Sequence, residues 1–209
     1  KRLRACVIAL KPQILKTEAA RLRAIAESGV PMISIAAGSS IKLMSRAWGK
    51  SARIIRTMPN TPGSIGEGIS ALYAAPNATP RDRKLAESLL AALGETVWVK
   101  RETDIDAVTA VSGSGPAYVF LLVECLEEAA RKEGLPPSIA HRLARQTIIG
   151  AGALLKADDA PAEALRRNVT SPHGTTEAAL GVLMAKDGLA PLIKRAVSAA
   201  RRRARELAT

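Results

Sequence analysis

The first half of the chain alternates short aliphatic and β-branched runs with segments of helical spacing. A run of helical spacing over residues 12–28 ends at Gly29, and a second begins at Ser39 or Ser40. A third begins at Thr79-Pro80, and its Leu85, Leu89 and Leu93 share a face before Gly94. This alternation predicts a parallel, doubly wound α/β sheet. The runs predicted as strands are residues 5–10, 32–37, 53–58, 69–74 and 96–99.

From about Asp104 onward the strand signals stop and only helical patterns remain. The predicted helices begin near Pro116, Pro137, Pro161, Thr175 and Pro191, and Gly188 is expected to end the fourth. We therefore predict a partial Rossmann-like domain over residues 1–103 and an all-helical domain over residues 104–209.

Residues 118–126 are apolar on every side of their predicted helix, and residues 150–153 read Gly-Ala-Gly-Ala. A helix of this kind must be buried all round, which a half of this size hardly achieves alone. We infer that it packs against a second copy of the chain, so that the helical half is a dimerisation domain. The alternative is a core helix within one monomer.

Composition narrows the class of protein further. The chain has 209 residues, of which 47% are hydrophobic and 24% charged, so a globular fold is expected. No apolar stretch approaches the roughly 20 residues that span a bilayer, and no secretory signal is recognisable. Cys6 and Cys125 lie apart in apolar surroundings, which argues against a disulfide framework. A soluble, cytoplasmic protein without a membrane partner is the expectation.

The net charge of +12 fits an anionic ligand, nucleic acid or a solvated basic surface. Proteins that read single strands stack bases on aromatic rings, yet no aromatic residue follows Phe120, where most arginine clusters lie. Nucleic acid is therefore not the expected partner. An anionic substrate or cofactor and a merely solvated surface both remain open.

The signatures of dinucleotide binding, metal binding and a catalytic triad lack the sequence context that each of them needs. Residues 66–71 match the letters G-x-G-x-x-A, but they precede a predicted strand and cannot aim a helix N-terminus at a pyrophosphate. Gly150 and Gly152 lie inside a predicted helix. His141 and His173 have no neighbouring ligands at metal-binding spacing, so no metal is expected. Ser114 and Ser171 lack any sign of a catalytic triad.

Three segments carry more information. Lys11-Pro12 follows the first strand, at the edge where open α/β sheets place ligands. Residues 56–62, Arg-Thr-Met-Pro-Asn-Thr-Pro, end the third strand in a stiff loop. Residues 169–176 bring hydroxyls, a glycine and free amides to a helix N-terminus, which suits a carboxylate or phosphate. A simple capping loop is the alternative for this last segment.

Together with the Ser-Gly-Ser-Gly-Pro of residues 112–116, these segments resemble the pyrroline-5-carboxylate reductase family. The resemblance covers essentially the whole chain in the family's order and includes Ala-Ala-Gly at residues 36–38 and Thr-Ser-Pro-x-Gly-Thr-Thr at residues 170–176. It implies NADPH- or NADH-dependent reduction of a cyclic imine to proline, and a homodimer that swaps its helical domains.

The resemblance also implies roles for particular residues. Thr176 is the expected catalytic residue, because its hydroxyl would bond the ring nitrogen. The substrate would bind to Thr176 and to Ser171, Gly174, Thr175, Glu102 and Asp159, although both acids could be ordinary surface carboxylates. The cofactor would contact Ala9, Leu10, Lys11, Pro12, Ala37 and Asn168.

Two departures from the family pattern leave alternatives open. His173 stands where the family usually has glycine, and the family's opening glycine-rich turn has no counterpart, so a truncated chain is expected. An intact mass of 22.0 kDa would contradict a longer chain. The alternatives are an inactive dimerising remnant, a related dehydrogenase for another small acid, and a nucleic-acid module using Arg201, Arg202, Arg203 and Arg205. The preference between NADPH and NADH cannot be read from these residues.

Overall fold

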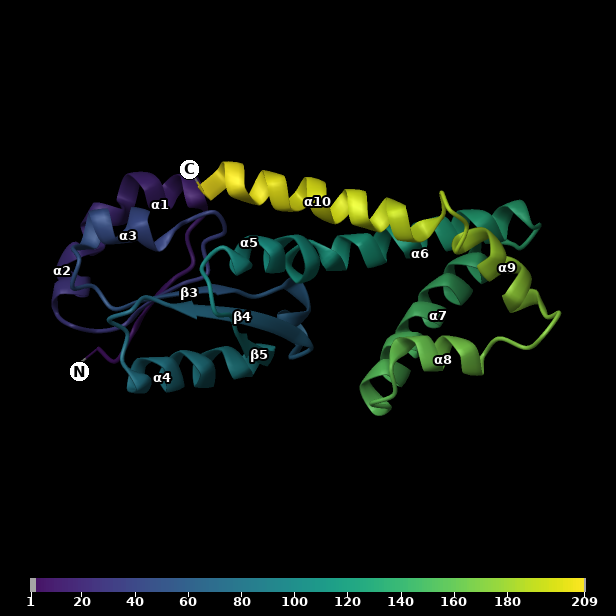
Figure 1. The fold of residues 1–209 in the computed structure, drawn as a ribbon, viewed down its shortest axis with the longest axis horizontal. Helices are drawn as coiled ribbons and strands as arrows, with labels where there is room; N and C mark the ends of the chain where they lie inside the picture. Colours follow the sequence, from purple (N-terminus) through teal and green to yellow (C-terminus); the bar gives the residue numbers. More distant parts are fainter. Residues whose placement is uncertain (1–2, 209) are drawn as a thin grey trace. The chain divides into compact units, whose positions relative to one another are not determined.

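The structure, a computed structural model, describes residues 3–208, and its contacts divide the chain into two compact units (Figure 1). The first unit comprises Lys1–Pro116 together with Val197–Thr209, and the second comprises Ala117–Ala196. The predicted domain boundary between residues 103 and 104 stays a prediction.

The first unit is built on a five-stranded sheet in the order β1-β2-β3-β4-β5. The strands are β1 (Cys6–Ile8), β2 (Met32–Ser34), β3 (Ile54–Met58), β4 (Gly68–Ala74) and β5 (Gly94–Trp98). All five predicted strands are present, but the prediction of a wholly parallel sheet was wrong because β3 and β4 are antiparallel. The connection between them holds only a short 3-10 turn, Thr61–Ile65, and is too short for the crossover that a parallel pair needs.

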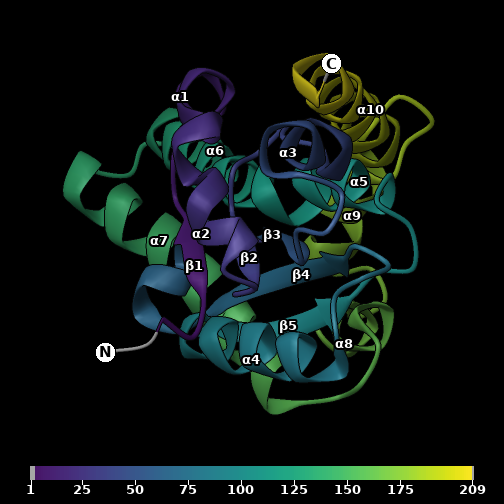
Figure 2. The ribbon, with the colours of Figure 1, turned by 90° about the vertical axis from the view of Figure 1, so that its left-hand side faces the viewer.

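Helices cover both faces of this sheet (Figure 2). On one face lie α1 (Pro12–Glu18), α2 (Arg23–Glu27) and α3 (Ile41–Trp48), and on the other lies α4 (Pro80–Leu90). The single helix predicted over residues 12–28 is interrupted by a 3-10 segment, Ala19–Leu22. The Trp48 indole donates to the Ala19 carbonyl at 2.7 Å, so this interruption is anchored in the core beneath α3.

Helix α4 begins as predicted and faces the sheet differently. Thr79 and Asp82 form a reciprocal capping box at its start. The buried face, however, carries Asp82, Ala86 and Leu90, whereas the predicted Leu89 is 42% exposed. The predicted face and the buried face of α4 both repeat every four residues, so spacing alone does not distinguish them. The face that approaches the sheet is the one with the small Ala86.

The rest of the chain is helical, as predicted. Its elements are α5 (Asp104–Val108), a π-helical turn (Thr109–Gly113), α6 (Gly115–Lys132), α7 (Pro137–Ala157), α8 (Ala162–Asn168), α9 (Thr175–Leu183) and α10 (Leu189–Ala208). Helix α9 ends at Leu183, earlier than the predicted end at Gly188. Gly188 instead lies so close to Leu183 that a Cβ there would meet its carbonyl oxygen at 2.4 Å.

The π-helical turn joins α5 to α6, so the longest apolar helix is longer than the sequence indicated. Asp104–Lys132 forms one helix that is long and apolar enough to cross a membrane by length and composition alone. The expectation that no segment approaches this length was therefore wrong. Small residues of the Ser-Gly-Ser-Gly-Pro segment hide the continuity of the helix in the sequence. A core helix of a soluble protein passes the same criterion.

Candidate active site

The carboxyl edge of the sheet gathers the predicted cofactor residues of the first unit. Ile8 pairs with Ser34 and Ser34 with Arg56, so β1, β2 and β3 reach this edge in register. The chain then turns into the segment that holds Ala9 and Lys11, and into the segment that holds Ala37. Lys11 is exposed and precedes α1, which begins at Pro12. The structure therefore brings these residues to one edge, as the position of the lysine-proline segment predicted.

The loop after β2 is fixed from two sides. The Ser34 hydroxyl accepts from the Ala36 amide at 3.3 Å. Gly38 has a φ of +68°, and a Cβ there would lie 2.9 Å from the Leu207 Cβ and carbonyl oxygen. Glycine is required at this position, because both the left-handed backbone and the close approach of α10 exclude a side chain.

The polar cluster beneath this loop joins Arg56, Glu102 and Asp106. The Arg56 side chain is only 4% exposed and donates to Glu102 at 3.2 Å and to Asp106 at 3.4 Å. Glu102 also accepts the Ile41 amide at 2.7 Å, at the start of α3. A buried arginine must be paired, and these two carboxylates provide the pairing.

This cluster bears on the expected role of Glu102. Its carboxylate is only 28% exposed and bonded, so the reading of an ordinary surface acid was wrong for this residue. The sequence analysis missed the cluster, although one signal was present. Arg56 follows Ile54 and Ile55 in a predicted strand, and the residues of this strand are nearly all buried in the structure. Its role in binding substrate stays a prediction. Asp159, by contrast, lies exposed between α7 and α8.

In the second unit, the loop between α8 and α9 forms as predicted. Gly174 is the N-cap of α9, and Thr175 and Thr176 occupy its first turn. The first amides of a helix lack acceptors inside it, so they remain available to an anion. A Cβ on Gly174 would lie 2.4 Å from the Ser171 hydroxyl oxygen, which explains the glycine. Asn168, the last residue of α8, is exposed near this loop in the sequence.

The same loop carries one feature that the sequence did not reveal. His173 has a φ of 59°, in the left-handed region, and its amide donates to the Glu177 carboxylate at 2.7 Å. Glu177 therefore occupies the amide immediately before the N-cap. An anion bound to this loop would have to use the amides beyond it.

The glycine and serine motifs of the sequence are placed as expected. The G-x-G-x-x-A letters run through Gly66, a turn residue with φ of +77°, into β4, so they form no strand-to-helix turn. Gly150 and Gly152 lie within α7. Ser112 and Ser114 donate their hydroxyl groups to backbone carbonyls of their own helix. Within residues 3–208, no group of three metal-ligating side chains comes together.

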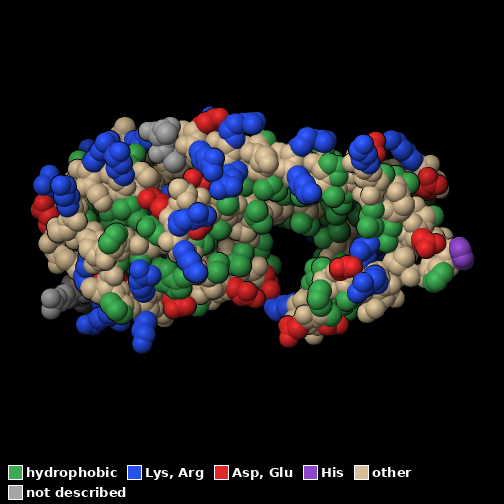
Figure 3. Space-filling model, in the orientation of Figure 1, with side chains coloured by type: hydrophobic (Ala, Val, Ile, Leu, Met, Phe, Trp, Pro, Cys, Tyr) green, Lys and Arg blue, Asp and Glu red, His purple; other side chains and the backbone are tan. Residues whose placement is uncertain are grey.

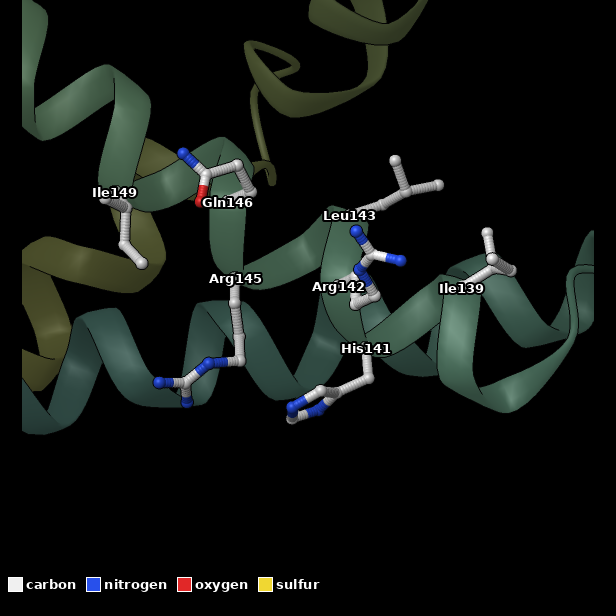
Figure 4. Close-up of a pocket in the computed structure, with 7 residues that line it drawn as sticks. All are labelled: Ile139, His141, Arg142, Leu143, Arg145, Gln146 and Ile149. Carbon is white, nitrogen blue, oxygen red and sulfur yellow. The ribbon is translucent and has the colours of Figure 1, made fainter.

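A hollow of about 430 Å³ lies along α7, lined by Ile139, His141, Arg142, Leu143, Arg145, Gln146 and Ile149. Figure 4 shows that all seven labelled side chains come from this one helix. None of the predicted substrate or cofactor residues lines it. It is an open groove on a helix surface, and its chemistry does not indicate an active site.

Comparison with known proteins extends over nearly the whole chain. Residues 102–207 match the protein family described as "Pyrroline-5-carboxylate reductase dimerisation". A pyrroline-5-carboxylate reductase from Pseudomonas aeruginosa is 42% identical over 97% of this chain and 74% of its own length. A solved structure of such a reductase from Coxiella burnetii is 40% identical with a TM-score of 0.90, covering 97% of this chain and 75% of that chain.

A third similar protein is a pyrroline carboxylate reductase from Plasmodium falciparum, solved with NADP bound. It is 32% identical with a TM-score of 0.87, covering 99% of this chain and 78% of that one.

Proposed function

This chain belongs to the pyrroline-5-carboxylate reductase family, and we propose that it reduces 1-pyrroline-5-carboxylate to L-proline with NADPH or NADH. The observation that carries the proposal is 42% identity to a reductase of this name over 97% of the chain. We further propose that the protein acts in the cytoplasm as a homodimer, which its match to a dimerisation family supports.

The sheet edge of the first unit suits the nicotinamide end of such a cofactor. Ala9 and Ala37 carry small side chains there, and the exposed Lys11 supplies a positive charge that complements an anionic dinucleotide. Leu10 and Pro12 complete this edge, and Asn168 is the proposed contact from the helical unit. When bound, the cofactor supplies the hydride.

The substrate carboxylate would bind the amides of the loop before α9. Ser171, Gly174, Thr175 and Thr176 stand at this helix N-terminus, where the helix dipole adds on the order of 1 kcal/mol to the binding of an anion. The carboxylate of Glu177 takes up the His173 amide, and the Gly174 amide donates to the Ser171 carbonyl at 3.1 Å. The first-turn amides of α9 therefore remain for the ligand.

Reduction of the C=N bond adds a hydride to the ring carbon and a proton to the nitrogen. Thr176 would hold the ring nitrogen through its hydroxyl group as that atom becomes an amine. Protonation of the imine favours hydride addition, and an acid must support it. Glu102 is already bonded to Arg56 and the Ile41 amide, which favours Asp159 as the supporting acid.

The test is NADPH oxidation, followed at 1-pyrroline-5-carboxylate concentrations that span saturation, with protein whose intact mass has been verified. We expect substrate-dependent oxidation with proline as the product. Reactions without substrate are one control, and reduction of NADP+ with small hydroxy acids is the other. Reduction of NADP+ by a hydroxy acid, without oxidation of NADPH by the cyclic imine, would overturn the proposal in favour of a related dehydrogenase. Absence of saturable NADPH binding would indicate a ligand-binding remnant.

A further inference from the structure

A cavity of about 540 Å³ opens in the first unit at the amino ends of its parallel strands. Its walls come from the segment before β1, the turn between α2 and β2, the residue before β3 and the first turns of α4. Ala9, Lys11 and Ala37 follow the opposite, carboxyl ends of these strands. The cavity is therefore separate from the proposed cofactor edge.

Basic side chains dominate the charge of this cavity. Arg4, Arg53, Arg81 and Lys84 line it, and Asp82 is the one acidic residue among its lining residues. Figure 3 shows Lys and Arg side chains gathered around the beginning of α4. Convergence of four cations from three segments of the chain raises the local potential far more than scattered surface charges do.

Asp82 does not neutralise these charges. Its carboxylate accepts from the Thr79 amide at 2.9 Å and the Thr79 hydroxyl at 2.8 Å, and it holds Arg53 at 3.3 Å. Within residues 3–208, no carboxylate forms a salt bridge with Arg4, Arg81 or Lys84. Three of the four cations therefore remain available to a ligand.

Arg53 provides a fixed donor at the wall of the cavity. Its side chain is 30% exposed, and its Nη1 is held by Asp82 at 3.3 Å. A guanidinium presents a rigid fork of donors that matches phosphate oxygens. Ser88 also lines the cavity, and its hydroxyl group adds a further donor, whereas the Ser28 hydroxyl donates to the Ile25 carbonyl at 2.7 Å.

We propose that this cavity binds a small polyanion that carries at least two phosphate groups. A single carboxylate would leave most of the cations unpaired, whereas two linked phosphates match three or four of them. The inference does not depend on the proposed reductase activity, because it uses no residue of that site.

The experiment titrates inorganic pyrophosphate into the protein by calorimetry, with and without saturating NADPH. We expect saturable binding that persists when NADPH is bound, since the cavity and the cofactor edge lie at opposite ends of the strands. Loss of pyrophosphate binding on saturation with NADPH would overturn the proposal, because it would assign the pyrophosphate to the cofactor site.

The deciding variant is R81Q/K84Q, and we expect it to weaken pyrophosphate binding about tenfold or more. The matched control is K42Q/R46Q, which removes two exposed charges from α3 outside the cavity and should leave binding within about twofold. Equal weakening by both variants would overturn the proposal in favour of attraction by the overall charge. If R81Q/K84Q does not fold, R4Q replaces it, because Arg4 lies in an extended segment.

Discussion

The backbone of His173 is the clearest residue-scale departure from regular geometry. It is the one non-glycine residue with a positive φ among residues 3–208, at 59°. This conformation costs an L-residue about 1 kcal/mol or more, whereas glycine adopts it without strain. A glycine at this position would adopt the observed backbone without strain. Nothing in the structure explains the histidine.

Replacing His173 by glycine should stabilise the protein. Relief of the left-handed strain exceeds the added entropy of the unfolded chain, and we expect a gain of up to about 1 kcal/mol in the free energy of unfolding. Denaturant unfolding of H173G against the parent measures it. H173A is the control, since alanine keeps the strain and should give no gain. A destabilised H173G would show that the imidazole makes a favourable interaction.

Thr176 belongs to the same loop, and its proposed role is chemical. Removal of its hydroxyl in T176A should lower kcat about a hundredfold with little effect on KM. T176S keeps the hydroxyl and should retain most of the activity. Steady-state kinetics on both variants decide the matter. Unchanged constants in T176A would remove Thr176 from the reaction.

At Ser171, substitution by proline removes a backbone amide donor, so the KM for substrate should rise while kcat changes little. Steady-state kinetics on S171P measure both constants, and S171A, which keeps the amide, is the control. An unchanged KM in S171P would exclude this amide from carboxylate binding.

At the scale of elements, the sequence predicted what local pattern determines. Caps, prolines and aliphatic runs located all five strands and the starts of most helices, but not those of α2 and α5. It could not predict features that depend on distant partners. The antiparallel pairing of β3 and β4 depends on the length of their connection, and the break at Ala19 lies where the Trp48 indole bonds the backbone. For the same reason, the Arg56 cluster went unnoticed, whereas the roles predicted for Lys11 and Thr176 rest on local motifs and stay predictions.

The Arg56 cluster ties three elements together, because Glu102 joins β3 to the start of α3. Glu102→Gln removes one of two charges opposite Arg56, and we expect a loss of about 1–2 kcal/mol in the free energy of unfolding. The loop that carries Ala37 precedes α3, so the KM for NADPH should rise more than kcat falls. Denaturant unfolding and cofactor kinetics test this. Glu95→Gln, on an exposed position of β5, should change neither quantity.

Helices α6 and α7 are linked by a hydrogen bond between Glu127 and His141, with 3.0 Å between Oε2 and Nδ1. Hydrogen bonds from His141 and then Arg131 hold the pKa of Glu127 below its usual value of 4.5. A carboxylate with a lowered pKa stabilises the folded state above the unfolded-state pKa, and this stabilisation is lost as the pH falls through the folded-state value.

Consequently, stability should decline with acid below about pH 5, and E127Q should decline less steeply than the parent. Thermal unfolding at a series of pH values measures both slopes. Glu128→Gln is the control, because that side chain is 70% exposed and its pair with Lys132 is solvated. Identical slopes for E127Q and the parent would exclude Glu127 as the titrating group.

At the scale of the molecule, the single chain leaves a large apolar surface uncovered. No residue of α6 is buried, and Phe120 is 60% and Leu121 57% exposed. A Cβ placed on Gly150 or Gly152 of α7 would have nothing within 4 Å, so these glycines present open backbone. Surfaces of this kind mark protein interfaces, in agreement with the match to a dimerisation family.

Gly150→Leu should weaken self-association by about tenfold or more, because a bulky side chain would block close helix approach. The folded monomer should survive, since leucine favours a helix more than glycine does. Sedimentation velocity across a concentration series measures the change. Gly150→Ala, which adds a single methyl group, should have a smaller effect. A dimer of unchanged strength in Gly150→Leu would place the interface elsewhere.

The contact between Leu207 and Gly38 has a practical consequence. Leu207, in the last turn of α10, packs closely against Gly38 in the loop that carries Ala37, although the two residues are far apart in the chain. A variant shortened before Leu207 would lose this close packing against Gly38, and the loop that carries Ala37 would become less constrained.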